Sequence, residues 1–207
     1  MRDATSLTLY HARASSASYR VRIALELKQV EVRYHEIDLG AAQHLTPQYL
    51  ALNPLGLVPA LVIGEGKVLT QSLAIVQWLD EHYPHLRLLP QNATQLSPVL
   101  EFCSVIGCDI HPLQSRRLAR WLEDAGAQTG LFPQVARRAV AEGLAAAEQL
   151  VAMNEGPFCM GGQVTAADAW ALPQLRNARA YDVDIECFPR LLQAEAATKR
   201  LLPASAG

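Results

Sequence analysis

The fold is decided by residues 7–29, which read LTLYHARASSASYRVRIALELKQ. The β-type run from Leu7 to Tyr10 predicts a strand. Small polar residues follow it, and the segment from Ser16 to Gln29 then carries apolar residues every three to four positions, which predicts an amphipathic helix. A strand that leads through a short loop into a helix is typical of the first half of a βαβ unit.

The alternation of strands and helices continues to about residue 90. The sequence predicts further strands at 32–37, 60–63 and 67–69 and helices at 47–52 and 72–82, in the order β-α-β-α-β-β-α. The helix between the first two strands implies a parallel, right-handed crossover. The Gly64-Glu65-Gly66 turn implies an antiparallel hairpin between the last two strands. We therefore expect a mixed four-stranded sheet with helices packed on it.

Beyond residue 90 the pattern is helical almost throughout. Apolar residues recur at helical intervals over 135–151 and 166–178, and Thr165-Ala-Ala-Asp168 has the spacing of a capping box at a helix start. The fold class is therefore an α/β domain followed by an all-α domain. We expect the first domain at 1–87, a linker at 88–95 and the helical domain at 96–207.

The composition excludes several classes of protein. With 207 residues, 50% of them hydrophobic and 18% charged, the chain can bury a core without disulfides and is not disordered. A formal net charge of -2 offers no basic field to a nucleic acid or an anionic membrane. No apolar run approaches the ~18 residues that cross a bilayer, and the N-terminus lacks the regions of a secretion signal, so we expect a cytoplasmic protein.

The four cysteines predict neither a disulfide framework nor a metal centre. They lie at positions 103, 108, 159 and 187, without a Cys-x-x-Cys pair and without histidines at metal-ligand spacing. Because cysteine is often fully buried, we expect reduced thiols in the core.

Two junctions between a strand and a helix are candidate binding sites. Ser15 and Ser16 lie at the first, where the amides and dipole of the helix N-terminus favour an anion and a hydroxyl adds a donor. The alternative is that one of these serines only caps the helix. Gln71 and Ser72 lie at the second junction, where they could bind a carboxylate, and the alternative there is capping by Ser72.

A third candidate is the segment NPLGLVPAL at 53–61. Proline cannot donate within a β-ladder, so Pro59 directly before a strand suggests an edge strand or a cis Val58–Pro59 bond. A cis bond would offer the backbone of Val58 to a peptide-like ligand. The alternative is a rigid turn without a ligand. All three candidate sites face the same end of one predicted sheet.

Together these segments resemble the zeta class of glutathione transferases, also called maleylacetoacetate isomerases. The resemblance is carried by SSASYRVRIAL at 15–25, ALNPLGLVPAL at 51–61 and LTQSLAI at 69–75, and it continues in CDIHPLQ at 108–114, GPFC at 156–159, VTAAD at 164–168 and LPQLRNA at 172–178. It covers roughly residues 7–192. It implies a thioredoxin-like first domain that binds glutathione, an all-helical second domain and a homodimer.

The resemblance also implies roles for single residues. Ser15, with Ser16 beside it, takes the place of the hydroxyl that hydrogen-bonds the glutathione sulfur. A free thiol has a pKa of about 8.5, so a donor at a helix N-terminus would raise its thiolate population at neutral pH. The cofactor glutathione would be bound by His44, Val58, Pro59, Gln71, Ser72 and His111, and the segment from His111 to Arg117 would complete the cleft.

The activity that the resemblance implies is cis–trans isomerisation of a maleyl dicarboxylate. Glutathione thiolate adds to the cis double bond, the resulting single bond rotates and the thiolate leaves, so glutathione acts as a coenzyme. Arginines should bind the substrate carboxylates, and the candidates are Arg13, Arg117, Arg176 and Arg179. For each of them the alternative is a solvated surface charge. The sequence departs from the family at Ala17, where many members have cysteine, and at Ala180, where relatives often have arginine.

Three questions stay open at this point. The substrate could be maleylacetoacetate or maleylpyruvate, because pocket depth separates them. The chain could instead be a general transferase that conjugates glutathione to small electrophiles or dehalogenates short haloacids. A non-catalytic thioredoxin-fold module used for protein contacts is the third possibility, although the retained serine loop argues against it.

Overall fold

The computed structural model describes residues 6–203 and contains two compact units. One is formed by the residues up to Leu88 together with 202–203, and the other spans Leu89–Leu201. In the first unit the elements are β1 (Leu7–His11), α1 (Ser16–Leu27), β2 (Arg33–Glu36), the 3₁₀ turn η1 (Gln43–Leu45), α2 (Pro47–Leu50), β3 (Ala60–Ile63), β4 (Lys67–Thr70) and α3 (Ser72–His82). The predicted order of strands and helices is confirmed.

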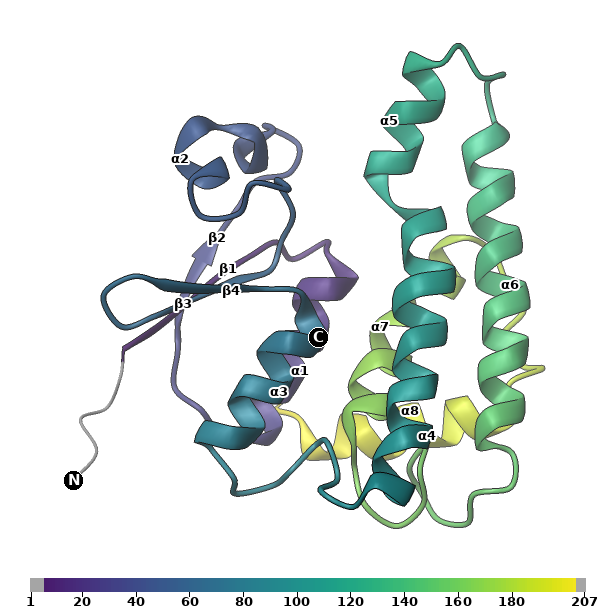
Figure 1. The fold of residues 1–207 in the computed structure, drawn as a ribbon. Helices are drawn as coiled ribbons and strands as arrows, with labels where there is room; N and C mark the ends of the chain where they lie inside the picture. Colours follow the sequence, from purple (N-terminus) through teal and green to yellow (C-terminus); the bar gives the residue numbers. More distant parts are fainter. Residues whose placement is uncertain (1–5, 204–207) are drawn as a thin grey trace. The chain divides into compact units, whose positions relative to one another are not determined.

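The sheet of the first unit has the strand order β2-β1-β3-β4. β1 and β2 are parallel, and β3 is antiparallel to both β1 and β4, so the predicted crossover and hairpin are confirmed. Helices α1 and α3 lie side by side on one face of the sheet, and α2 lies on the other side (Figure 1). The centre of this unit is built from fully buried residues of the strands and of both helices, among them Leu9, Ile23, Leu61, Ile75 and Leu79.

The register of the strands brings several chain segments to one end of the sheet. Tyr10 pairs with His35 on one side and with Ala60 on the other, and Ala60 pairs in turn with Thr70. The loops after β1, β2 and β4 and the loop before β3 therefore all emerge at the same end, as the sequence predicted.

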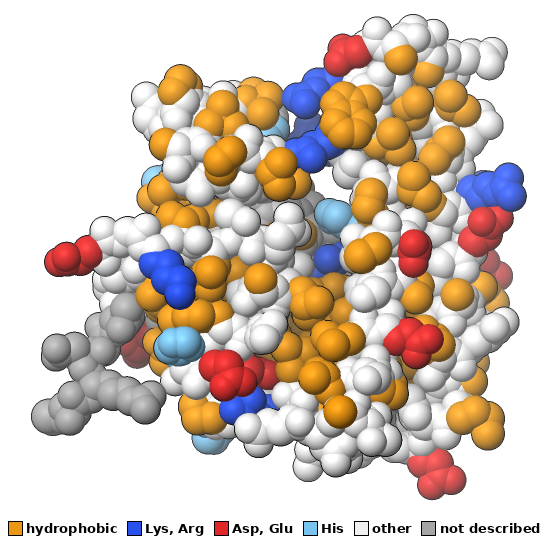
Figure 2. All heavy atoms as spheres, in the orientation of Figure 1, with side chains coloured by type: hydrophobic (Ala, Val, Ile, Leu, Met, Phe, Trp, Pro, Cys, Tyr) orange, Lys and Arg blue, Asp and Glu red, His pale blue; other side chains and the backbone are white. Residues whose placement is uncertain are grey.

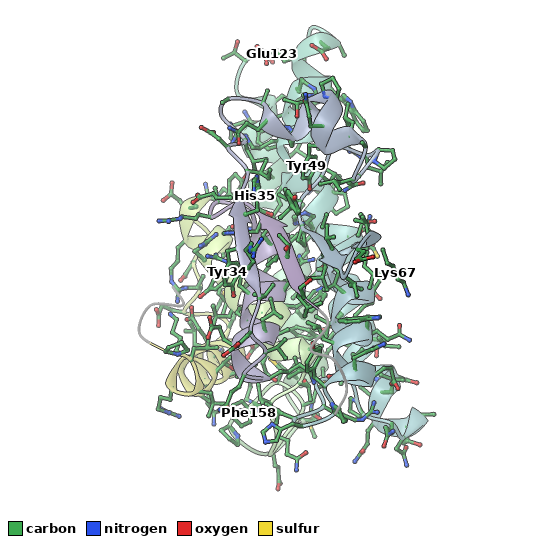
Figure 3. All side chains as sticks on the ribbon, turned by 90° about the vertical axis from the view of Figure 1, so that its left-hand side faces the viewer. Tyr34, His35, Tyr49, Lys67, Glu123 and Phe158 are labelled. Atoms are coloured by element: carbon green, nitrogen blue, oxygen red, sulfur yellow. The ribbon has the colours of Figure 1, made fainter. Side chains whose placement is uncertain are left out.

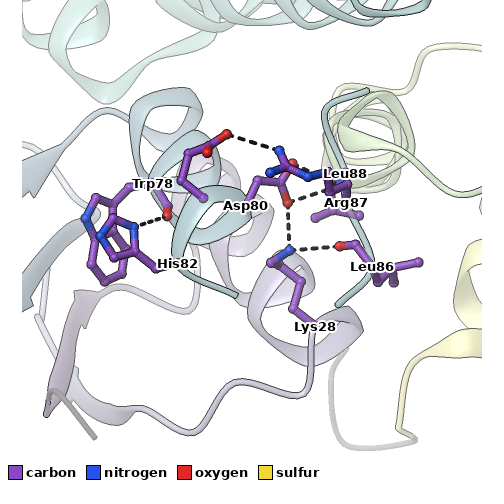
Figure 4. Close-up of polar contacts among 8 residues, drawn as sticks. Lys28, Trp78, Asp80, His82, Leu86, Arg87 and Leu88 are labelled. Atoms are coloured by element: carbon purple, nitrogen blue, oxygen red, sulfur yellow. Dashed lines mark hydrogen bonds and ion pairs between the residues drawn. The ribbon is translucent and has the colours of Figure 1, made fainter. Parts of the chain in front are cut away.

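A buried ion pair joins α1 and α3 of the first unit. Lys28 follows the last turn of α1, and its Nζ lies 2.7 Å from Oδ1 of Asp80 on α3, with both side chains almost completely buried (Figure 4). The ammonium also donates to the Leu86 carbonyl at 2.8 Å, and the Asp80 carboxylate accepts from the Leu88 amide. The pair thus ties the segment that leaves this unit to α1 and α3.

The second unit is helical, as predicted. Its elements are α4 (Ala93–Ser104), a π-helical turn η2 (Val105–Ile110), a 3₁₀ turn η3 (His111–Gln114), α5 (Arg116–Asp124), α6 (Leu131–Val151), α7 (Ala166–Ala180) and α8 (Pro189–Leu201). The capping box at the start of α7 is confirmed: Asp168 accepts from the Thr165 amide at 2.8 Å, and its other oxygen accepts from the Cys159 amide at 2.8 Å.

The expectation of four core cysteines is wrong for two of them. All four are free thiols, but only Cys103 and Cys159 are buried. Cys108 lies in the π-helical turn and Cys187 in the loop before α8, where its Sγ donates to the Asp184 carbonyl, and both are exposed. Burial raises the pKa of the Cys159 thiol well above its usual value, so this thiol stays protonated at neutral pH.

The surface carries charges of both signs. On the face shown in Figure 2, lysine and arginine side chains are interspersed with aspartate and glutamate, in keeping with the net charge of -2. Within the described residues, none of the helices has the length and apolar character needed to span a membrane.

Candidate functional site

The first part of the site is the start of α1. Ser15 is the N-cap of this helix, and its Oγ accepts from the Ser18 amide at 3.1 Å. The capping alternative is therefore correct for Ser15, but it does not exclude a second role, because capping uses a lone pair and leaves the hydroxyl proton to donate. Ser15 is half-buried, whereas Ser16 is the first residue of α1 and is only 5% exposed.

The loop between β1 and α1 is fixed by its own hydrogen bonds. The Ser15 amide donates to the Ala12 carbonyl at 3.1 Å, and the Ala12 amide donates to Ser18 Oγ at 3.3 Å. Since the first-turn amides of an α-helix have no intrahelical acceptor, the Ser15 hydroxyl stands in a field that favours negative charge. This arrangement suits the binding of a thiolate or another anion beside Ser15.

The second part is the loop that leads into β3. The Val58–Pro59 peptide bond is cis, as one of the sequence alternatives predicted. The edge-strand alternative is wrong, because β3 is paired on both sides. Val58 is half-buried and Pro59 is buried, and the preceding carbonyl of Leu57 accepts two hydrogen bonds of 2.6 Å from Tyr49 Oη and Asn53 Nδ2.

The third part is the junction of β4 and α3. Gln71 is the N-cap residue of α3 and makes no capping bond with its side chain, so the alternative of a Ser72 cap is wrong. The backbone of Gln71 has φ 71° and ψ 118°, a region that costs a non-glycine residue about 1–3 kcal/mol. Such strain is concentrated at functional sites. The exposed side chain of Gln71 and the buried Ser72 thus stand at a second helix N-terminus.

His44 joins these residues through the loop packing. It lies in the turn η1 after β2 and is half-buried. A Cβ atom at Gly56 would lie 3.0 Å from the His44 carbonyl oxygen, so the turn that carries His44 packs against the loop that carries Val58. Ser15, His44, Val58 and Gln71 therefore belong to four segments that meet at one end of the sheet.

The other predicted residues of this unit lie at its edge. Arg13 is exposed, and its Nε donates to Glu36 at 3.1 Å. An exposed pair of this kind contributes little to stability, so the guanidinium can exchange Glu36 for another carboxylate. Sequence reasoning missed the buried His11 at the end of β1, whose pKa is lowered first by burial and then by Arg22.

The predicted residues of the second unit lie on the segment 111–117 and on α7. His111 opens the turn η3 and Arg117 lies in the first turn of α5, with its guanidinium 5.7 Å from the centre of the Trp121 ring. Gln114, between them, exchanges hydrogen bonds of 2.8 and 3.2 Å with Gln174, two residues before Arg176. This buried amide pair holds the 111–117 segment against α7.

Arg179, another predicted carboxylate ligand, binds an acidic side chain of the protein through both of its terminal nitrogens. Its two terminal nitrogens bind both oxygens of Glu195 on α8 at 2.7 and 2.6 Å. Burial raises the pKa of Glu195, but its hydrogen bonds with Arg179 and Lys199 outweigh that effect and lower it. In a fork-to-fork pair of this geometry, both terminal nitrogens of Arg179 bind Glu195, and these are the groups that would bind a substrate carboxylate.

Comparison with known proteins places this arrangement in a family. The model of the glutathione S-transferase N-terminal domain matches residues 5–81. The first unit thus has the fold of a glutathione S-transferase N-terminal domain. A maleylpyruvate isomerase from Ralstonia sp. is 37% identical over 198 residues, which are 94% of this chain and 93% of the relative.

Two solved structures of isomerases are also similar to this chain. A maleylpyruvate isomerase described as a bacterial zeta-class glutathione S-transferase is 36% identical and superimposes with a TM-score of 0.87 over 96% of this chain and 97% of that one. A maleylacetoacetate isomerase from Methylobacterium extorquens, determined with bound malonate and glutathione, is 32% identical with a TM-score of 0.87 over 95% and 96%. The chain belongs to the zeta class of glutathione transferases, the family of maleylpyruvate and maleylacetoacetate isomerases.

Proposed function

We propose that this chain isomerises a maleyl dicarboxylate of the maleylpyruvate or maleylacetoacetate kind to its fumaryl isomer, with glutathione as coenzyme. The observation that carries the proposal is the meeting of Ser15, Val58 and Gln71 at one end of the sheet. A helix N-terminus with a hydroxyl, an extended backbone segment and a second helix N-terminus match the thiol, the peptide backbone and a terminal carboxylate of a tripeptide.

The proposed roles follow from this match. The Ser15 hydroxyl donates to the sulfur and favours its ionised form, with Ser16 next to it at the helix N-terminus. The Val58 backbone, set by Pro59, pairs with the cysteinyl backbone, and Gln71 and Ser72 bind the γ-glutamyl end. His44 is proposed to bind near the glycine end, and His111 is proposed as a further glutathione ligand. When bound, glutathione supplies the thiolate that adds to the double bond and leaves after the bond has rotated.

The dicarboxylate is proposed to bind to arginines. Arg117 and Arg176 lie on segments that the Gln114–Gln174 pair holds together, and Arg13 lies beside the serine loop. Two arginines on separate elements can bind the two carboxylates of one substrate in a fixed orientation. We do not propose Arg179 as a substrate ligand, because both of its terminal guanidinium nitrogens donate to Glu195.

The proposed organisation is that of the family. The first domain, 1–87, binds glutathione, the helical domain, 96–207, contributes the pocket for the dicarboxylate, and 88–95 links them. We propose a homodimer that acts in the cytoplasm, where glutathione is reduced and the four free thiols of this chain persist.

The test follows a cis-maleyl substrate by absorbance with catalytic amounts of glutathione, while a thiol titration measures the glutathione that remains. We expect substrate to convert with glutathione conserved. Ser15→Ala should lower the rate about 100-fold, as for the loss of one donor to a developing or bound anion, and should lower the ultraviolet absorbance of the bound thiolate. Ser16→Ala is the matched control and should retain most of the rate.

Two results would contradict the proposal. Consumption of glutathione in step with substrate would show a conjugating transferase. Binding of glutathione without conversion of either maleyl substrate would show that the dicarboxylate site is absent.

A further inference from the structure

Two buried side chains that the catalytic chemistry does not use converge on one carbonyl. Tyr49 Oη and Asn53 Nδ2 each donate to the Leu57 oxygen at 2.6 Å. Tyr49 is 3% and Asn53 is 2% exposed, whereas Leu57 is 37% exposed. The backbone carbonyl of an exposed loop residue is thus turned inward and held by two donors.

The orientation of this carbonyl fixes the next amide. The Leu57–Val58 peptide bond is trans, since Val58–Pro59 is the one cis bond among the described residues. In a planar trans peptide the C=O and the N–H point in opposite directions. The Val58 N–H is therefore directed away from Tyr49 and Asn53. Two donors on the carbonyl also polarise the peptide unit, which strengthens its N–H as a donor.

The two donors are themselves held in place. Asn53 Oδ1 accepts from the Leu55 amide at 3.1 Å, and the Asn53 carbonyl accepts from the Gly56 amide at 2.8 Å, so the side chain is fixed by its own turn. The centre of the Tyr49 ring lies 6.2 Å from that of the Tyr10 ring. Tyr49 is labelled in Figure 3. Burial raises the pKa of Tyr49, so its hydroxyl remains a protonated donor over the whole physiological range.

We propose that Tyr49 and Asn53 are positioning residues for glutathione: by binding the Leu57 carbonyl, they aim the Val58 N–H at a carbonyl of the tripeptide backbone. This inference rests on the role proposed for Val58. It assigns to Tyr49 and Asn53 an effect on the affinity for glutathione and none on the thiolate chemistry at Ser15.

The test is Tyr49→Phe, which removes one donor and keeps the ring. We expect the Kd and the KM for glutathione to rise about two- to tenfold, the effect of one net hydrogen bond, while kcat at saturating glutathione is unchanged. In the free enzyme the Val58 amide proton resonance should move upfield, because its peptide unit is less polarised. Asn53→Asp replaces the donor by an acceptor. It should raise the Kd and the KM for glutathione further and move the Val58 amide resonance further upfield.

The matched control is Tyr10→Phe, which removes a hydroxyl from the neighbouring ring and leaves both donors to Leu57 in place. It should bind glutathione like the native enzyme. A purely structural role of Tyr49 would lower the fraction of active enzyme, and hence kcat, without changing KM, and that result would overturn the inference.

Failure of the inference and failure of the proposed site can be told apart. If glutathione shifts the Val58 amide resonance of the native enzyme but Tyr49→Phe binds glutathione with native affinity, only the positioning role is wrong. If glutathione leaves that resonance unmoved, the role of Val58 is wrong, and this inference is wrong with it.

Discussion

The substitution Lys28→Met removes one member of the ion pair between α1 and α3 (Figure 4). The Asp80 carboxylate, whose side chain is 1% exposed, would keep its hydrogen bonds from the Leu88 amide but lose the ammonium at 2.7 Å. The Leu86 carbonyl would lose its donor at 2.8 Å. Leu86 has a φ of 78°, so this contact also holds a residue in an unfavourable backbone region.

The size of the effect follows from the burial of the pair. Removing one partner of a buried ion pair costs about 3–5 kcal/mol, because the other charge stays in the core without compensation. Asp80→Asn should cost a similar amount, since it leaves the ammonium of Lys28 beside a neutral amide. At roughly 2–4 °C per kcal/mol for a chain of this size, either variant should melt about 6–20 °C below the native protein.

The double variant Lys28→Met with Asp80→Asn separates charge burial from the other contacts. Neither charge of the pair then remains buried, and the asparagine oxygen can still accept from the Leu88 amide. Only the Leu86 carbonyl lacks a donor, which costs about 1–3 kcal/mol. We therefore expect the double variant to be more stable than either single variant, by about 2 kcal/mol.

The assay is urea denaturation followed by circular dichroism, with hydrogen exchange of the α1 amides to locate the loss in the first unit. Two results would refute the reasoning. One is a cost below about 1 kcal/mol for Lys28→Met, which would mean that water or relaxation compensates the carboxylate. The other is a double variant whose destabilisation equals the sum of the two single ones, which would mean that the pair is not coupled.

Two further predictions concern the pH dependence and the helix packing. The pKa of His11 is lowered from 6.5, mainly by burial. Between the folded and unfolded pKa values the unfolded chain therefore binds a proton that the folded chain does not. The free energy of unfolding should thus fall as the pH drops below about 6.5 towards the folded pKa. Urea midpoints at several pH values should show this slope and its reduction in His11→Gln; an unchanged slope in His11→Gln would show that His11 does not cause it. In α6, Gly143→Ala would place its Cβ 2.2 Å from Ile110 Cγ1, and this overpacking should cost about 1–3 kcal/mol in thermal denaturation. In an Ile110→Ala background the same change should be neutral or stabilising by up to about 1 kcal/mol, because alanine is the better helix former, and a persistent loss there would contradict the steric explanation.

The elements of the first unit could be predicted because their signals are local. The hairpin follows from Gly64 and Gly66, and the strands and helices follow from their apolar periodicity. The end of α1 was placed two residues late, since Gln29 adopts φ 53° and glutamine gives no signal for a left-handed residue. Serine is a common cap residue, so the pattern allows Ser72 as the cap of α3. In the structure Gln71 is the N-cap residue, with a left-handed φ of 71° that glutamine does not signal.

Features that depend on tertiary packing could not be predicted in this way. The π-helical turn at 105–110 has no distinct apolar pattern, and the contact of Gly143 with Ile110 joins residues 33 positions apart. The exposure of Cys108 follows from that turn. The sequence gives only part of the signal for the two hydrogen bonds from Tyr49 and Asn53 to Leu57. An asparagine at a turn suggests side-chain hydrogen bonding, whereas a tyrosine four residues earlier does not.

The two halves of the candidate site therefore differ in how far sequence can define them. The glutathione half consists of junctions between consecutive elements, and strand register alone brings Ser15, Val58 and Gln71 together. The carboxylate half consists of arginines, and their function depends on which acidic side chain each one meets in the fold. Glu195 binds Arg179 across two helices, a competition that no local pattern reveals. For the same reason, the role proposed for Arg117 and Arg176, on the two segments that Gln114 and Gln174 join, needs a test by substitution of each arginine.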